Sequence, residues 1–205
     1  MSATPSQRYD AGIARGEWQD DPAQRAVLRE LDRLHAEVSA QGAAPGLLGK
    51  LFGKPDVAPR GLYLWGGVGR GKTFLVDLFY DGLDFGEKRR AHFHRFMREI
   101  HARLKQHAGE RDPMAAIARE WRREMRVLVL DEFFVTDIGD AMLLAKLLEH
   151  MVAEGITLVT TSNTAPENLY KDGLHRAGFL PAIVLIQRPC VVLRSGGEPA
   201  YRLRP

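Results

Sequence analysis

The sequence lacks the features of a secreted or membrane-spanning protein. It has a single cysteine, Cys190, which excludes an intrachain disulfide and is typical of a reducing compartment. No apolar run is long enough to cross a bilayer, and the N-terminal stretch has no apolar core of a signal peptide. Acidic side chains at Asp10 and Glu17 argue against a transit peptide. We therefore expect a cytoplasmic protein without a transmembrane segment.

The chain also lacks a strong charge of either sign. Its net charge is +3, and its 29 basic residues comprise 22 arginines and 7 lysines. The arginine excess fits weak contact with nucleic acid or an acidic partner, but an ordinary solvated surface explains it as well, and we rank that explanation higher. With 45% hydrophobic residues in a chain of 205, there is enough apolar material for a buried core, and the length suggests one domain with an appendage.

Two parts are expected, with the boundary near residue 59. Residues 1–58 form an N-terminal helical segment and a linker rich in glycine and proline, and residues 59–205 form the core. In the first part, Asp21 caps a helix and Pro22 occupies its first turn. An apolar stripe then recurs at helical spacing, at Val27, Leu31, Leu34 and Val38. Such a stripe packs on its own chain more often than on a partner, so we expect it to cover the core.

In the core, apolar strands alternate with helical segments. The expected strands are residues 62–65, 90–96, 126–132 and 156–163, followed by a C-terminal β-hairpin of residues 190–195 and 200–204. The expected helices are residues 72–83, 97–107, 112–125 and 140–155. Apolar runs such as VLVL at 127–130 do not alternate with polar residues, so both faces of the sheet are covered. The pattern predicts an α/β fold, with a parallel sheet flanked by helices.

The segment GGVGRGKT, residues 66–73, matches the phosphate-binding pattern G-x-x-x-x-G-K-[S/T]. It lies where a buried strand turns into a helix, so backbone N–H groups and the helix N-terminus face an anion. Lys72 is placed to reach the β and γ phosphates of ATP, and the Thr73 hydroxyl to hold Mg²⁺. A flexible glycine turn is the alternative, and we rank it far lower. Nucleotide binding is assigned to Gly66, Gly67, Val68, Gly69, Arg70, Gly71, Lys72 and Thr73.

A pair of carboxylates, Asp131 and Glu132, ends the apolar strand that begins at Val127. The strand brings Asp131 to the carboxyl edge of the sheet, where it is placed to hold the Mg²⁺ shell. Glu132 can polarise a water for attack on the γ phosphate, which suits a hydrolase better than a small-molecule kinase. The pattern also occurs at ordinary strand ends, but the P-loop earlier in the chain favours the catalytic interpretation.

Asn163 ends the apolar strand TLVTTSN. If this strand lies between the strands that lead to Lys72 and Asp131, its amide reaches the γ phosphate and the attacking water. The alternative is a cap of the short helix or turn that follows. His92 and His94 are expected to share one face of a strand, but without a third ligand we assign them to packing or partner contact rather than to a metal site.

The segments that carry these motifs resemble the ZapE-like cell-division ATPases, a family of the AAA+ class with mitochondrial relatives. The resemblance covers nearly the whole chain, and its most specific motifs are HFHRFM, DEFFVTDI and NLYKDGL. It implies a P-loop NTPase core of AAA+ type, ATP hydrolysis with Mg²⁺, and homo-oligomers in full-length members. For bacterial members it also implies association with the division ring through FtsZ, in the cytoplasm or peripherally at the inner membrane.

The sequence departs from this family in two places. Where members usually carry a second arginine after the sensor asparagine, this chain has Gly178, and Arg176 remains the candidate for a catalytic arginine. The chain ends at Pro205, before the region that would form the lid over the nucleotide in the family. We therefore expect Mg-ATP binding with slow turnover in a largely monomeric chain.

Three functions are ranked on these grounds. An ATPase that acts as a ring or clamp on protein partners comes first. A nucleic-acid-handling AAA+ protein of helicase-loader type comes second, because of the arginine content. A module that binds ATP without hydrolysing it comes third, because of Gly178 and the missing lid.

Overall fold

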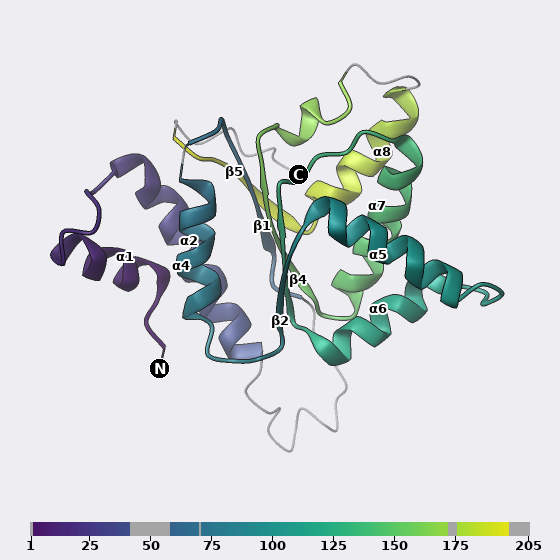
Figure 1. Cartoon of the computed structure of the whole chain (residues 1–205), viewed down its shortest axis with the longest axis horizontal. Coiled ribbons are helices and arrows are strands. Elements are labelled where there is room, and N and C mark those ends of the chain that lie inside the picture. The colour runs from purple at the N-terminus through teal and green to yellow at the C-terminus, as the bar shows by residue number, and fades with distance from the viewer. Residues whose placement is uncertain (1, 42–57, 70, 172–175, 197–205) are drawn as a thin grey trace.

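A five-stranded parallel sheet forms the centre of the chain (Figure 1). The computed structural model describes residues 2–41, 58–69, 71–171 and 176–196. The sheet has the order β2-β3-β4-β1-β5, and every neighbouring pair is parallel. Its strands are β1 (Gly61–Trp65), β2 (Lys88–His92), β3 (Val127–Asp131), β4 (Thr157–Ser162) and β5 (Cys190–Arg194). Parallel strands end at the same edge of a sheet, so the residues that follow β1, β3 and β4 gather at one edge.

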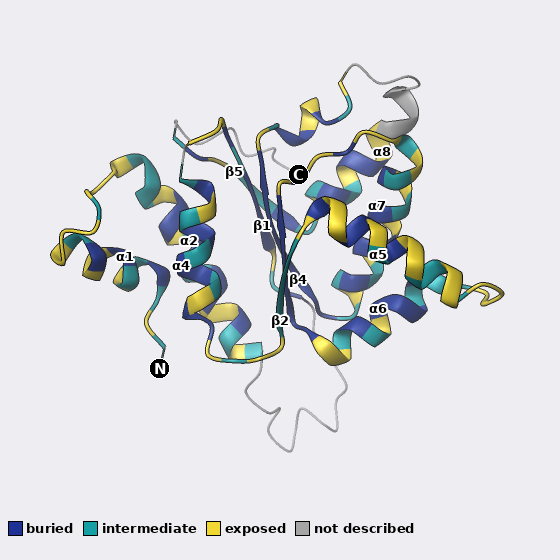
Figure 2. Cartoon of the chain, viewed as in Figure 1, coloured by how far each residue is buried: buried dark blue, intermediate teal, exposed yellow. Residues whose placement is uncertain are grey.

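Helices cover both faces of the sheet, which explains why β3 and β4 are buried along their whole length (Figures 1 and 2). Alternate residues of β1 serve the two cores: Leu62 and Leu64 face one helical layer, and Tyr63 faces the other. The first layer contains α1 (Pro5–Ala14), α2 (Pro22–Gln41) and α4 (Lys72–Gly82). The second contains α5 (Phe93–Gln106), α6 (Pro113–Glu124), α7 (Ile138–Ala153) and α8 (Arg176–Gln187), and a short 3₁₀ helix, η1 (Pro166–Asn168), follows β4.

Helix α2 begins at Pro22, as the sequence predicts. Asp21 Oδ1 accepts a hydrogen bond from the backbone N–H of Ala23 at 2.9 Å, which satisfies one of the free donors of the first turn. The predicted stripe is buried in the core that α2 shares with α4 and the sheet, so its packing on its own chain is confirmed. The domain boundary near residue 59 stays a prediction, and linker residues 42–57 lie outside the described part of the chain.

The predicted strand over residues 90–96 is too long. Strand β2 ends at His92, and α5 begins at Phe93. Phe93, Phe96 and Ile100 recur at helical spacing and are buried, so packing of this stripe selects the helix. His92 and His94 therefore do not share a strand face, and the premise of a paired histidine site is wrong. Across the described residues, no group of three His, Cys, Asp or Glu side chains is placed to hold a metal ion.

Two helices were not predicted. Helix α1 begins with a capping box, in which Thr4 and Gln7 exchange side-chain to backbone hydrogen bonds. Helix α8 carries Pro181 in its interior. The first strand of the predicted hairpin is β5, which pairs with β1, while the second strand, residues 200–204, lies outside the described residues. None of the described helices combines the length and the apolar character that a membrane crossing requires.

Candidate nucleotide-binding site

The predicted P-loop joins the end of β1 to the start of α4. Gly71 is the N-cap of α4 and has φ of 73°, in the left-handed region that favours glycine. Gly66 is confined for a different reason: a Cβ there would lie 2.8 Å from the backbone oxygen of Ser195. The two glycines allow the chain to turn tightly with its N–H groups open to an anion at the helix N-terminus. Arg70 lies outside the described residues.

Lys72 is a nearly buried ammonium that neutral acceptors surround. Its side chain donates to the backbone oxygens of Gly66 at 2.7 Å and Gly67 at 2.8 Å, and to Oδ1 of Asn163 at 3.0 Å. No carboxylate among the described residues pairs with it, and burial lowers the pKa of its ammonium. A desolvated cation with only neutral partners is well placed to bind an incoming phosphate.

A hollow opens beside this lysine, lined by Gly69, Gly71, Lys72, Thr73 and Phe74. Thr73 is exposed there, so its hydroxyl is free to reach a metal ion on bound phosphates. Val68 at the tip of the loop is 88% exposed, so the loop is open to solvent.

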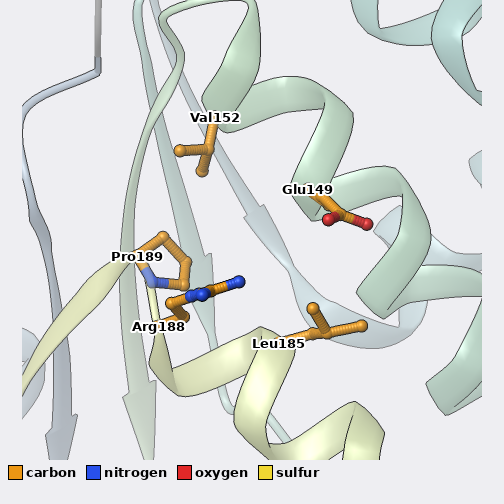
Figure 3. A pocket seen from close by; sticks show the side chains of 5 residues that line it. All are labelled: Glu149, Val152, Leu185, Arg188 and Pro189. Carbon is orange, nitrogen blue, oxygen red and sulfur yellow. The ribbon is translucent and has the colours of Figure 1, made fainter. Parts of the chain in front are cut away.

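A different pocket lies between α7 and α8, lined by Glu149, Val152, Leu185, Arg188 and Pro189 (Figure 3). Pro189 directly precedes β5, so this pocket is at the amino edge of the parallel sheet. The P-loop is at the carboxyl edge, and the two hollows are therefore separate.

Asp131 ends β3 and is only 8% exposed. Its carboxylate accepts two hydrogen bonds from Arg90, Nε to Oδ2 at 2.6 Å and Nη2 to Oδ1 at 3.2 Å. The Thr161 hydroxyl donates to Oδ1 at 3.4 Å. The sequence predicted the carboxylate but missed Arg90. The available signal was an arginine in β2, the strand that precedes α5. Strand β2 pairs with β3, and the side chain of Arg90 is on the same face of the sheet as that of Asp131.

Glu132 directly follows the buried Asp131, but its own side chain is exposed. Its φ is 57°, an uncommon value for a residue other than glycine, and its N–H donates to the Thr161 hydroxyl at 3.2 Å. His92 Nδ1 lies 4.0 Å from Glu132 Oε2, and both side chains are more than two-thirds exposed. The turn after Asp131 thus separates a buried carboxylate from a solvated one, which can polarise a water.

Asn163 follows β4, and β4 lies between β1 and β3, as its predicted role requires. Its side chain contacts Lys72, whereas the cap of η1 is Ala165, which makes no side-chain capping bond. The contact favours a place in the phosphate site over the alternative of a helix cap. Arg176 is the first residue of α8, but its side chain and that of Phe179 lie outside the description, so the catalytic arginine stays a prediction.

The oxygen donors of the site suit Mg²⁺. A hydroxyl from Thr73 and a carboxylate from Asp131 are hard ligands of the kind that Mg²⁺ prefers, and the ion commonly retains water and binds phosphates. Lys72, which has no carboxylate partner in the part of the chain that the structure describes, complements them because its buried charge favours an anion. The residues present therefore fit a magnesium nucleotide.

The chain resembles known ATPases in sequence. The sequence profile of the AFG1-like ATPases matches residues 3–205. "Cell division protein ZapE" of Escherichia coli (strain K12) is 45% identical over 215 residues, covering 100% of this chain and 57% of that protein. "Lactation elevated protein 1 homolog B" of Danio rerio is 42% identical over 157 residues, covering 71% of this chain and 31% of that protein. The chain thus spans little more than half the length of the bacterial relative.

Solved structures show the same fold at low sequence identity. DnaI superposes with a TM-score of 0.57 at 17% identity, covering 86% of this chain and 87% of DnaI. AMPPCP-bound DnaA from Aquifex aeolicus gives 0.55 at 11% identity, covering 87% of this chain and 48% of DnaA. These likenesses support the predicted P-loop fold of AAA+ type. On its sequence and its fold together, the chain belongs to the AFG1-like ATPase family.

Proposed function

We propose that this chain binds Mg-ATP at the P-loop and hydrolyses it. The observation that carries the proposal is Lys72, a desolvated ammonium whose partners among the described residues are neutral oxygens, one of them from Asn163. Phosphate oxygens would replace the backbone acceptors of Gly66 and Gly67 with charged ones, and charge-assisted hydrogen bonds are the stronger kind. The P-loop N–H groups at the start of α4 would hold the same phosphates.

Four side chains divide the remaining work. Thr73 and Asp131 would hold Mg²⁺, which when bound offsets the negative charge of the phosphates. Glu132, exposed at the end of β3, would act as the general base that takes a proton from the attacking water. Asn163 would orient that water and, through Lys72, keep the ammonium aligned with the γ phosphate.

The proposal is tested by the pair of variants Glu132→Gln and Glu167→Gln. Binding is followed with a fluorescent ATP analogue and turnover by phosphate release. Glu132→Gln should bind within about threefold of the parent and hydrolyse on the order of a hundredfold more slowly, as loss of a general base predicts. Glu167→Gln, an exposed carboxylate in η1, is the control and should match the parent in both measurements.

Two results would overturn it. Equal loss of binding and turnover in Glu132→Gln would make this residue structural. Tight binding by the parent without any phosphate release would instead make the chain a module that binds ATP without hydrolysing it.

A role in cell division is proposed from the likeness to ZapE of Escherichia coli. The partner would be FtsZ, the place of action the cytoplasm or the inner face of the membrane at the division site, and the active form a homo-oligomer in which Arg176 serves a neighbouring subunit. Co-sedimentation with FtsZ polymers, with and without ATP, tests the partner. Retention of the chain in the supernatant under both conditions would reject it.

A nucleic-acid-handling function of helicase-loader type is the second candidate. It is favoured by the exposed face of α5, where Arg95, Arg98 and Lys105 have no ion-pair partner within the described residues. Binding to single-stranded DNA that falls steeply with salt would raise this candidate above the first. Binding that is absent even at low salt would remove it.

A further inference from the structure

Arg90 donates hydrogen bonds to carboxylates of two elements, strand β3 and helix α4. Its Nε and Nη2 atoms donate to Asp131 at the end of β3, and its Nη1 atom donates to Asp77 in α4. The side chain of Arg90 is 22% exposed, that of Asp131 is 11% exposed and that of Asp77 is 45% exposed. The single positive charge of Arg90 thus compensates one of the two negative charges of Asp77 and Asp131.

The position of Asp77 brings this cluster to the proposed magnesium site. Asp77 follows Thr73 by four residues in α4, so the two side chains lie on the same face of the helix. Thr73 and Asp131 are the two residues assigned to Mg²⁺. The Asp77, Arg90 and Asp131 cluster therefore includes one of the two proposed magnesium ligands and begins one helical turn after the other.

Two carboxylates beside a hydroxyl make a set of hard oxygen donors that attracts a divalent cation. In this structure the guanidinium of Arg90 lies between the two carboxylates, so a positive charge already compensates them. A carboxylate offers about four acceptor positions. On Asp131, Arg90 uses two and Thr161 uses one, so an acceptor position remains for the shell of an ion that arrives with phosphates.

We propose that Arg90 is the charge-balancing residue of the magnesium site. It prevents Asp77 and Asp131 from binding a divalent cation before nucleotide is present, and it holds Asp131 in the orientation that the ion of Mg-ATP requires. Metal thereby enters the site with the nucleotide rather than ahead of it. This inference rests on the proposed Mg-ATP site and adds a residue that keeps the empty site free of metal.

The test measures binding of Mn²⁺ alone, without nucleotide, from the loss of the free-ion signal in electron paramagnetic resonance. Mn²⁺ prefers the same oxygen ligands as Mg²⁺. The parent should bind little Mn²⁺, and Arg90→Gln should bind one ion about tenfold or more tightly, since it exposes two uncompensated carboxylates. Adding Asp77→Asn to Arg90→Gln should remove the gain.

Two further variants separate charge from structure. Arg89→Gln is the matched control, because Arg89 is the adjacent strand residue and pairs with Glu99 on the other side of the sheet; it should behave as the parent. Arg90→Lys keeps a positive charge but loses the two-pronged contact, and it too should bind little Mn²⁺. Circular dichroism verifies that each variant is folded.

Several outcomes would overturn the inference. A folded Arg90→Gln chain without a gain in Mn²⁺ binding would do so, as would an equal gain in Arg89→Gln. If Arg90→Gln does not fold, Arg90→Lys still decides, because tight Mn²⁺ binding by that variant would show that charge compensation is not what excludes the ion. Failure of the parent to bind Mg-ATP would reject the proposed function alone, because the Mn²⁺ measurement uses no nucleotide.

Discussion

Lys72 Nζ donates a hydrogen bond to Asn163 Oδ1 at 3.0 Å, which links the first residue of α4 to the residue that follows β4. The two residues are 91 positions apart, and only the strand order brings them together. The bond aligns a cation that binds phosphate with an amide that can orient water. A change at Asn163 should therefore affect chemistry more than binding.

We expect Asn163→Ala to lower kcat by about a hundredfold, the usual effect of removing a polar group that acts on the transition state. The affinity for Mg-ATP should stay within about threefold, because Lys72 and the P-loop N–H groups remain. Phosphate release and equilibrium titration give the two numbers. Asn168→Ala, at an exposed position in η1, is the matched control. A less heat-resistant Asn163→Ala chain with normal specific activity would restore the helix-cap interpretation.

Replacing Lys72 should separate binding from stability. Lys72→Met should lose Mg-ATP binding, yet without ligand it should unfold at or above the parent's temperature, because methionine removes a buried charge that has no carboxylate partner among the described residues. Addition of Mg-ATP at 100 times Kd should stabilise the parent by about 2.7 kcal/mol, and the variant not at all. Thermal unfolding with and without nucleotide measures both effects. A variant that is markedly less stable than the parent without ligand would contradict the desolvation argument.

The pH dependence of this stability has a definite sign. Burial lowers the pKa of Lys72 in the folded chain below its ordinary value of 10.5, so between the two values the unfolded chain binds more protons. Stability therefore rises with pH across that interval, and at pH 7 the cost of burying the charge is fully present. The advantage of Lys72→Met over the parent should accordingly be constant near neutral pH and shrink as the pH approaches 10.5.

Much of the sheet could be predicted because its strands carry their own signal. The run that became β3 is apolar up to its final aspartate, and both β3 and β4 are buried along their whole length, which is typical of strands covered on both faces. The P-loop was recognisable because the spacing of its glycines, lysine and threonine matches a phosphate-binding pattern, and because that segment lies between a strand and a helix. The contact of Lys72 with Asn163 then followed from the rule that parallel strands end at one edge.

The end of β2 and the ion pair of Arg90 could not be predicted, because both depend on contacts between residues that are distant in the sequence. RAHFH, residues 90–94, alternates polar and apolar residues as a strand does, whereas Phe93 and Phe96 are three positions apart, as on one face of a helix. The two periods overlap at Phe93, so the short pattern does not show where the strand ends. Arg90 was missed because its partner Asp131 is 41 positions away and its contact depends on the register of β2 against β3. The local sequence shows the arginine in the strand but not the register that pairs it with Asp131.

Gly71→Ala should weaken both the fold and the site. A side chain is strained at φ of 73°, at a cost of about 1–2 kcal/mol, and its Cβ would lie 2.8 Å from Nε2 of Gln24. The midpoint of thermal unfolding should therefore fall by roughly 2–8 °C. Nucleotide affinity should fall as well, because the cap of α4 must shift. Gly86→Ala is the control, since nothing lies within 4 Å of a Cβ there and its φ is not in the left-handed region. Equal effects of both changes would show that the conformation of Gly71 is not the cause.

The single cysteine should report on unfolding. Cys190 begins β5 and is fully buried, and burial raises the pKa of its thiol to about 12. Since the thiolate is the reactive form, an aromatic disulfide reagent at pH 8 should leave the folded chain unlabelled for hours and modify one thiol per chain in denaturant.

Because β5 pairs with β1 directly before the P-loop, Mg-ATP should slow any residual labelling by stabilising that edge of the sheet. Nucleotide should have no such effect on Lys72→Met. Rapid labelling of the native chain would contradict the buried position of Cys190, and protection by nucleotide in Lys72→Met would contradict the part assigned to the lysine.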